Sequence, residues 1–124
     1  MFKLAYKDNY GTPSGVLIPM VAETTYKPGI ALTEKGAVAT GNVAPAYICA
    51  GSGVGVSGGE ILAHRVYKDM VFETELTADG SALEIGDKVA LSADGMGVTA
   101  TTGGSAEIVA IVDSAKGGIV KVRF

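Results

Sequence analysis

One short pattern occurs twice in this chain, about sixty residues apart, and it constrains the fold more than any other feature. The first copy spans residues 29–50 and the second spans residues 88–110. Each copy reads as a strand, a glycine turn, a second strand, a loop of small residues and a third strand. The matching pairs are Leu32 and Leu91, Thr33 and Ser92, Gly36 and Gly95, Val38 and Val98, Ile48 and Ile108, and Ala50 and Ala110. Two unrelated glycine-turned hairpins would also look alike over so short a stretch, so the pattern indicates two similar β units without establishing a duplication.

The composition fits many short strands joined by glycine turns. Glycine accounts for 18 of 124 residues, roughly twice the usual share. A hydrophobic fraction of 48% excludes general disorder, and this length is typical of one domain. We therefore expect an all-β fold, either a compact β-sandwich or a partly open β-barrel of short antiparallel strands. Its single β domain would span residues 16–124, preceded by an extended N-terminal arm at residues 1–15.

The N-terminal segment differs from the rest of the chain. Apolar and polar residues alternate over residues 2–7, and the glycine- and proline-containing stretch 11–15 follows. The alternation predicts a short strand or an extended arm. Two interpretations are open: the segment completes the domain's own sheet, or it docks on a neighbouring subunit.

Residues 60–76 are the main ambiguity in secondary structure. Ser57 and Glu60 have the spacing of a helix capping box, and Leu62, Val66 and Met70 recur at helical spacing. Two glycines would, however, fall in the first turn of that helix, and residues 70–76 alternate as a strand does. We favour two strands that meet at a turn or bulge near Lys68 and Asp69.

The C-terminal third is easier to interpret. Residues 88–92 and 97–102 predict a hairpin whose turn lies at residues 93–95. Residues 106–113 and 118–124 predict a second hairpin. In its last strand, apolar residues at 120, 122 and 124 alternate with Lys121 and Arg123, which is typical of a half-buried antiparallel strand.

Charge and cysteine content argue against several classes of protein. The net charge is −3 and no basic block occurs, so we expect no nucleic-acid partner. The longest apolar run, residues 16–22, is interrupted by Pro19 and is too short to span a membrane. The amino terminus has no apolar core typical of a signal peptide, and Cys49 alone cannot form an internal disulfide. A protein made in a reducing cytoplasm fits these features best.

No residue pattern points to catalysis. Residues 53–58 match the dinucleotide-binding glycine string, but that fingerprint needs a helix after the loop, and we interpret the stretch as a surface loop. His64 is the only histidine, and its combination with Asp69 and a serine lacks a nucleophile elbow. Glu73 and Glu75 are best explained as a solvated strand face. We therefore expect no enzymatic activity, no cofactor and no metal site.

Several strand-and-turn phrases resemble one family of proteins. They include a "pG-x-A-L" opening at residues 28–32, a "G-D-x-V" strand at residues 86–89 and a terminal "V-x-V-R-h" strand at residues 120–124. Over roughly residues 16–124 the chain resembles the small capsid-decoration, or cement, proteins of tailed bacteriophages and prophages. The phrases describe strands and turns rather than a chemical motif.

The resemblance implies a structural virion protein that binds the outer surface of a phage capsid and stabilises it by bridging capsomers. Its partner would be the major capsid protein, its assembly a homotrimer, and its location the capsid exterior after synthesis in the bacterial host cytoplasm. Members of this group often reach the shell through an N-terminal segment. The capsid-binding hypothesis therefore falls on Phe2, Leu4, Tyr6 and Tyr10, and deletion of residues 1–15 is expected to abolish binding while leaving the domain folded.

Two alternatives remain open. The chain could be a virion-surface or head-fibre-base module that recognises a host glycan or another ligand. Such a site would need exposed aromatic residues, and the candidates are Tyr6, Tyr10, Tyr26, Tyr47 and Tyr67. A small enzyme that depends on His64 is the second alternative.

Overall fold

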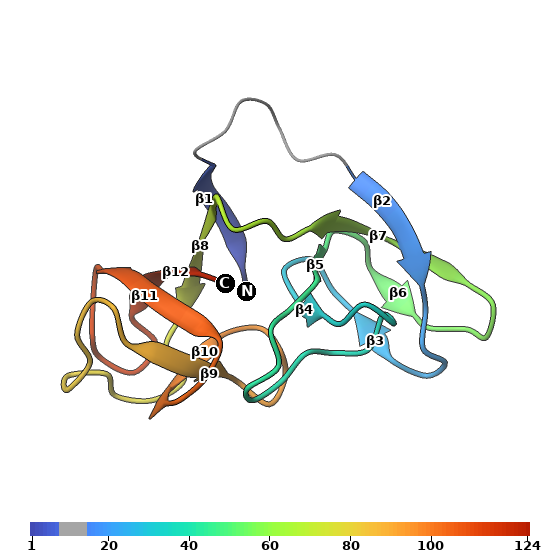
Figure 1. Ribbon diagram of the computed structural model, residues 1–124. Coiled ribbons are helices and arrows are strands. Elements are labelled where there is room, and N and C mark those ends of the chain that lie inside the picture. The colour runs from blue at the N-terminus through green and yellow to red at the C-terminus, as the bar shows by residue number, and fades with distance from the viewer. Residues whose placement is uncertain (8–14) are drawn as a thin grey trace.

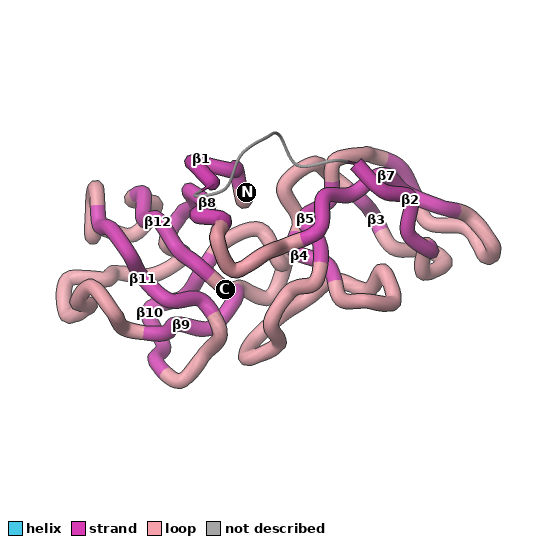
Figure 2. The backbone as a smooth tube through the Cα atoms, turned by 45° about the horizontal axis from the view of Figure 1, so that its top comes forward, coloured by secondary structure: helices cyan, strands magenta, loops and turns pink. Residues whose placement is uncertain are grey.

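The structure is a computed structural model that describes residues 1–7 and 15–124, with only the backbone of residues 6 and 7. Within these residues, 45% of the chain is strand, none of it is helix, and the sheets are antiparallel without closing into a barrel. Figure 2 shows how loops of varied length connect the short strands. The predicted all-β class is confirmed.

Sheet A contains six antiparallel strands in the order β1-β8-β12-β11-β9-β10. Their bounds are β1 (Lys3–Lys7), β8 (Met70–Glu75), β12 (Ile119–Arg123), β11 (Ala106–Ile111), β9 (Lys88–Leu91) and β10 (Val98–Thr102). Both predicted C-terminal hairpins belong to this sheet. In β12, Val120 and Val122 are fully buried, which confirms the half-buried strand expected from alternation.

Two smaller sheets complete the fold (Figure 1). Sheet B has the order β2-β7-β5-β4, with bounds β2 (Gly15–Pro19), β7 (Glu60–Arg65), β5 (Tyr47–Cys49) and β4 (Ala31–Leu32). Sheet C pairs β3 (Thr25–Tyr26) with β6 (Gly53–Val54). The chain crosses from sheet B to sheet A between β7 and β8.

Strands β4 and β5 of sheet B are buried on both faces. Successive side chains on a strand point to opposite faces, so neighbours in β4 and in β5 enter different cores. Ala31 and Ile48 belong to core 1, which packs against sheet A, whereas Leu32 and Cys49 belong to core 2. Core 2 also contains Tyr26 of sheet C. This part of sheet B therefore lies between the two hydrophobic cores.

Residues 1–7 complete the domain's own sheet, which is the first of the two interpretations of this segment. Strand β1 pairs with β8, and the amide of Phe2 donates to the carbonyl of Gly29 at 2.9 Å. The Phe2 side chain is 2% exposed and packs edge-on against Phe124, with ring centroids 5.6 Å apart. Both ends of the chain consequently lie together between the sheets (Figure 1).

The favoured interpretation of residues 60–76 is confirmed. Strands β7 and β8 flank a tight turn in which the amide of Met70 donates to the carbonyl of Tyr67 at 3.1 Å. Ile61 and Ala63 alternate into core 2, so the strand period governs burial here rather than the helical one.

The two repeated units share the same hairpin turn. The amide of Gly36 donates to Thr33 O, and the amide of Gly95 donates to Ser92 O, both at 3.0 Å. Both glycines have positive φ, 82° and 67°, which is the conformation that favours glycine at the end of such a turn. Next to each turn the equivalent residues are paired: Leu32 forms a β-bridge with Val38, and Leu91 pairs with Val98. Leu32 of the first hairpin packs into core 2, whereas Leu91 and Val98 of the second pack into core 1.

Candidate functional site

The four residues of the capsid-binding hypothesis do not form one exposed group in the described part of the chain. Phe2 is a core residue, and Leu4 is 40% exposed. Tyr6 lies in β1, where only the backbone is described, and Tyr10 lies outside the described residues. Because Phe2 fills core 1, deletion of residues 1–15 would remove a core side chain and a strand. The expectation that the domain stays folded after this deletion does not fit the structure.

One of the tyrosines proposed for ligand recognition, Tyr26, serves the fold instead. Tyr26 is 1% exposed; its hydroxyl accepts from the amide of Val21 at 2.8 Å and donates to the carbonyl of Gly36 at 2.7 Å. These two hydrogen bonds anchor the loop after β2 and the turn at Gly36 to core 2. Tyr67 is 50% exposed, and Tyr6 and Tyr10 have no described side chain.

Tyr47 belongs to a small polar network on the surface of sheet B. The Arg65 guanidinium donates to Tyr47 Oη at 2.9 Å and to Glu34 Oε1 at 3.1 Å, and it lies over the tyrosine ring. The Glu34 carboxylate raises the pKa of Arg65 and so favours the charged guanidinium. All three groups face solvent, where such pairs contribute little stability.

The glycine-rich loop does not have the geometry of a dinucleotide site. Gly53 and Val54 form strand β6, and the segment after Gly58 is strand β7 rather than a helix. Gly55 packs so closely on the carbonyl of Val21 that a Cβ there would lie 1.9 Å from the oxygen. The glycines thus allow close backbone packing between sheet C and the loop after β2.

An uncharged, exposed strand edge is the most distinctive surface feature. Strand β2 is at the end of sheet B and contains no charged residue. Leu17 and Leu62 are directly paired across β2 and β7, so their side chains project from the same face, 62% and 43% exposed. Val16 is 39% exposed. Among the described residues, no strand pairs with the outer edge of β2.

The other edges of sheets A and B are protected, and the two strands of sheet C are only two residues long each. Strand β1 carries Lys3 and Lys7, and charged lysines discourage edge-to-edge pairing. Val98 in β10 forms a β-bridge with Leu76, and Leu32 in β4 forms a β-bridge with Val38. Strand β2 is therefore the edge best suited to pair with another chain.

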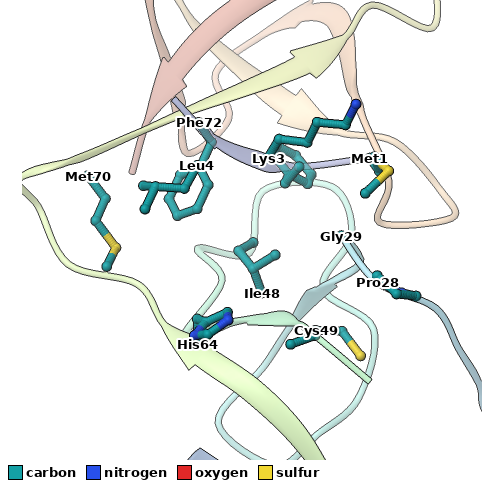
Figure 3. Close-up of a pocket in the computed structure, with 12 residues that line it drawn as sticks. Met1, Lys3, Leu4, Pro28, Gly29, Ile48, Cys49, His64, Met70 and Phe72 are labelled. Atoms are coloured by element: carbon teal, nitrogen blue, oxygen red, sulfur yellow. The ribbon is translucent and has the colours of Figure 1, made fainter. Parts of the chain in front are cut away.

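A cavity of about 390 Å³ opens between β1 and β8 on one side and β5 and β7 on the other (Figure 3). Its apolar wall consists of Phe2, Leu4, Ile48, Met70 and Phe72. Few polar groups line the cavity. It lies where sheets A and B meet, and no sequence pattern predicted a cavity there.

His64 lines this cavity, and its buried Nδ1 has no hydrogen-bond partner. The orienting hydrogen bond that a catalytic histidine donates from this nitrogen to a carboxylate is thus missing. Among residues 1–7 and 15–124, no three His, Cys, Asp or Glu side chains lie close enough to hold a metal ion. Glu75 is an exposed strand residue and Glu73 is half-buried beside it.

Cys49 is a buried structural thiol. Its Sγ donates to the carbonyl of Gly51 at 3.2 Å, and burial raises the pKa of the thiol despite this hydrogen bond. A raised pKa reduces the thiolate fraction, and the thiolate is the reactive form.

The described part of the chain contains no helix that is long and apolar enough to cross a membrane. Comparison of the chain with protein-family models, with curated proteins and with solved structures finds no match.

Proposed function

We propose that this protein is a non-catalytic virion protein that binds the outer surface of a phage capsid and stabilises the shell by bridging capsomers. The uncharged edge of strand β2 is the observation that supports this proposal. An open strand edge can accept an extended segment from a partner, whose main-chain groups supply affinity while side-chain pockets supply specificity. The partner would be the major capsid protein, and the bound protein would lie on the capsid exterior.

The apolar side chains around β2 support a protein partner. Leu17 and Leu62 form an apolar strip on one face next to the open edge, Val16 is exposed on the opposite face of β2, and burying such side chains stabilises an interface. The family-like phrases at residues 28–32, 86–89 and 120–124 lie in or beside strands β4, β9 and β12, away from this strip. These phrases would therefore preserve the fold, whereas the strip would carry the contact.

We further propose that the protein acts as a homotrimer. A trimer engages three equivalent sites on a symmetric shell at once, which raises its overall affinity without any new type of contact. Light scattering behind a sizing column measures the mass directly. A trimer supports threefold docking, and a monomer at the concentrations used for capsid binding contradicts it.

The capsid contact is tested by the exposed substitution Leu17→Lys. The probe is a preparation of DNA-free heads assembled from the major capsid protein of the phage or prophage from which this chain would come, and bound protein is measured by co-sedimentation. We expect Leu17→Lys to weaken binding at least tenfold, because a charge would be buried in the apolar strip. The matched control is Ile85→Lys, which changes a 69% exposed residue outside sheet B and should bind as the wild type does. Equal binding by wild type and Leu17→Lys, or no binding of wild type, would overturn the proposal.

A further inference from the structure

Alternate residues of strand β2 point their main-chain groups away from sheet B. The amide of Met20, just after β2, donates to the carbonyl of Gly59, just before β7, at 2.9 Å. Because successive residues of an antiparallel strand bond to opposite sides, residues 16 and 18 also bond to β7. The residues whose main-chain groups face the open edge are therefore Gly15, Leu17 and Pro19.

The part of this edge that another strand can use is short. Pro19 has no amide hydrogen to donate. The backbone of Gly36 also packs so closely on the carbonyl of Pro19 that a Cβ at Gly36 would overlap the oxygen. An added strand would therefore bond along residues 15–17 and not beyond them. Because so few main-chain hydrogen bonds form, side chains must supply most of the affinity.

The side chains beside this short edge favour an apolar partner residue. Leu17 and Leu62 are directly paired and project from one face, 62% and 43% exposed. Leu62 leans over β2 toward the edge, since its Cδ1 lies 2.8 Å from the position that a Cβ of Gly15 would take. A residue directly opposite Leu17 on an added strand would project from the same face. An aliphatic or aromatic side chain there would cover both leucines.

One charge borders this apolar strip. Glu60 is exposed and pairs with Pro19, two positions from Leu17. In the described part of the chain, no cation lies within ion-pair distance of its carboxylate. Glu60 is also the one formally charged residue on this face of the two strands, which consists of Gly15, Leu17, Pro19, Glu60, Leu62 and His64. A basic side chain near Pro19 would be attracted here, and an acidic one would be repelled.

We propose that the edge of β2 pairs with a short extended segment that carries an apolar residue opposite Leu17 and a lysine or arginine two residues away. The basic side chain would reach the Glu60 carboxylate across Pro19. The inference rests on the proposed function for the identity of the partner, because the segment would belong to the major capsid protein. A short pairing is weak by itself, so several copies engaged at once would hold the shell.

The test uses three synthetic heptapeptides with a central leucine. The residues two positions before and after the leucine are lysine in one peptide, glutamate in the second and threonine in the third, and all others are threonine. This symmetric design makes the result independent of strand direction. Binding to the full chain is measured by NMR titration. We expect the lysine peptide to bind about two- to fivefold more tightly than the threonine peptide, and the glutamate peptide to bind weakest.

Equal affinities for the three peptides would overturn the role of Glu60. Replacing the central leucine of the lysine peptide by threonine should weaken binding about tenfold or more, because the two leucines then stay exposed. Unchanged affinity would overturn the apolar anchor.

Variants separate the Glu60 carboxylate from the overall charge of the protein. Glu60→Gln should abolish the preference for the lysine peptide, and Glu60→Lys should reverse it in favour of the glutamate peptide. The matched control is Glu84→Gln, which makes the same change in net charge at an exposed residue outside sheet B and should keep the preference. Loss of the preference in Glu84→Gln as well would overturn a specific contact with Glu60.

Hydrogen exchange tests the main-chain pairing itself. In the free protein, the amide of Leu17 should exchange fast and that of Ile18 slowly, and the lysine peptide should slow exchange at Leu17. A Leu17 amide that is protected without peptide, or unaffected by it, would overturn strand addition at this edge. Heads that bind the protein while the peptides show no preference would overturn this inference alone. Peptide selectivity without binding to heads would support the pairing and contradict the proposed function.

Discussion

At the scale of single residues, Ser92 shows why one of the two repeated turns is held more firmly than the other. Its buried Oγ accepts from the amide of Gly97 at 3.0 Å and donates to Asp94 Oδ1 at 2.6 Å. Asp94 also accepts from the amide of Met96, and these hydrogen bonds lower the pKa of its carboxyl. In the first turn, the Thr33 hydroxyl accepts only an exposed 3.3 Å bond from Lys35 among those the structure describes.

Ser92→Ala is therefore expected to destabilise the protein by about 1–2 kcal/mol, because it leaves the buried Gly97 amide unpaired. Thr33→Ala, at the equivalent position of the first turn, should cost less than about 0.5 kcal/mol, because water replaces its exposed bond. Urea unfolding of both variants measures the difference. Equal losses would show that the buried serine network contributes nothing of its own.

The same substitution has an expected effect on titration. Loss of the Ser92 hydrogen bond should raise the pKa of Asp94 toward its ordinary value, which carboxyl chemical shifts measure directly. Since the folded-state pKa is lowered, this carboxylate stabilises the wild type above the unfolded-state pKa. That contribution is lost as pH falls through the folded value. The Ser92→Ala variant should lose less stability than the wild type over that acidic range.

At the scale of secondary-structure elements, strand β1 contributes to the core rather than extending as a free arm over residues 1–7. Alternation in residues 2–7 predicted a strand, but its two interpretations could be separated only by the position of its partner. That partner is β8, which begins at residue 70, far away in the sequence. Phe2 then meets Phe124 at the opposite end of the chain.

Phe2→Ala is expected to reduce the free energy of unfolding by about 3–5 kcal/mol, because it empties part of core 1. Leu4→Ala changes a 40% exposed side chain two positions further along the chain, in β1, and should cost less than about 1.5 kcal/mol. Chemical denaturation of both variants gives the comparison. A loss for Phe2→Ala no larger than that for Leu4→Ala would mean that residues 1–7 do not pack as described.

At the scale of the whole molecule, contacts between the two repeated hairpins connect sheet A with sheet B. The amide of Ala31 in sheet B donates to the carbonyl of Gly95, in the turn of the second hairpin, at 2.8 Å. Leu91 bridges to Gly41 of the first unit. Sheet B also supplies side chains to both cores. The two halves are therefore expected to unfold together.

Gly95→Ala tests this contact between the halves. A Cβ at Gly95 would lie 2.6 Å from Val38 Cγ1, and the residue has a φ of 67°. Gly103 also has positive φ, 92°, but nothing lies within 4 Å of its Cβ position, so Gly103→Ala isolates backbone strain. We expect about 1–2 kcal/mol for Gly103→Ala and at least about 1 kcal/mol more for Gly95→Ala. Calorimetry should show a single transition for wild type and both variants; two transitions would contradict joint unfolding of the halves.

The amino-acid sequence by itself determined the all-β class, the glycine turns of both hairpins and the half-buried C-terminal strand. These features depend on local rules: alternation of side chains along a strand, and the freedom of Gly36 and Gly95 to adopt positive φ. The lack of charge in residues 15–19 was also visible, although its position at a sheet edge was not. Strand order, the burial of both faces of β4 and β5 and the cavity beside His64 were decided only by the tertiary structure. They arise from pairings between distant segments, and no local pattern specifies which distant strands meet.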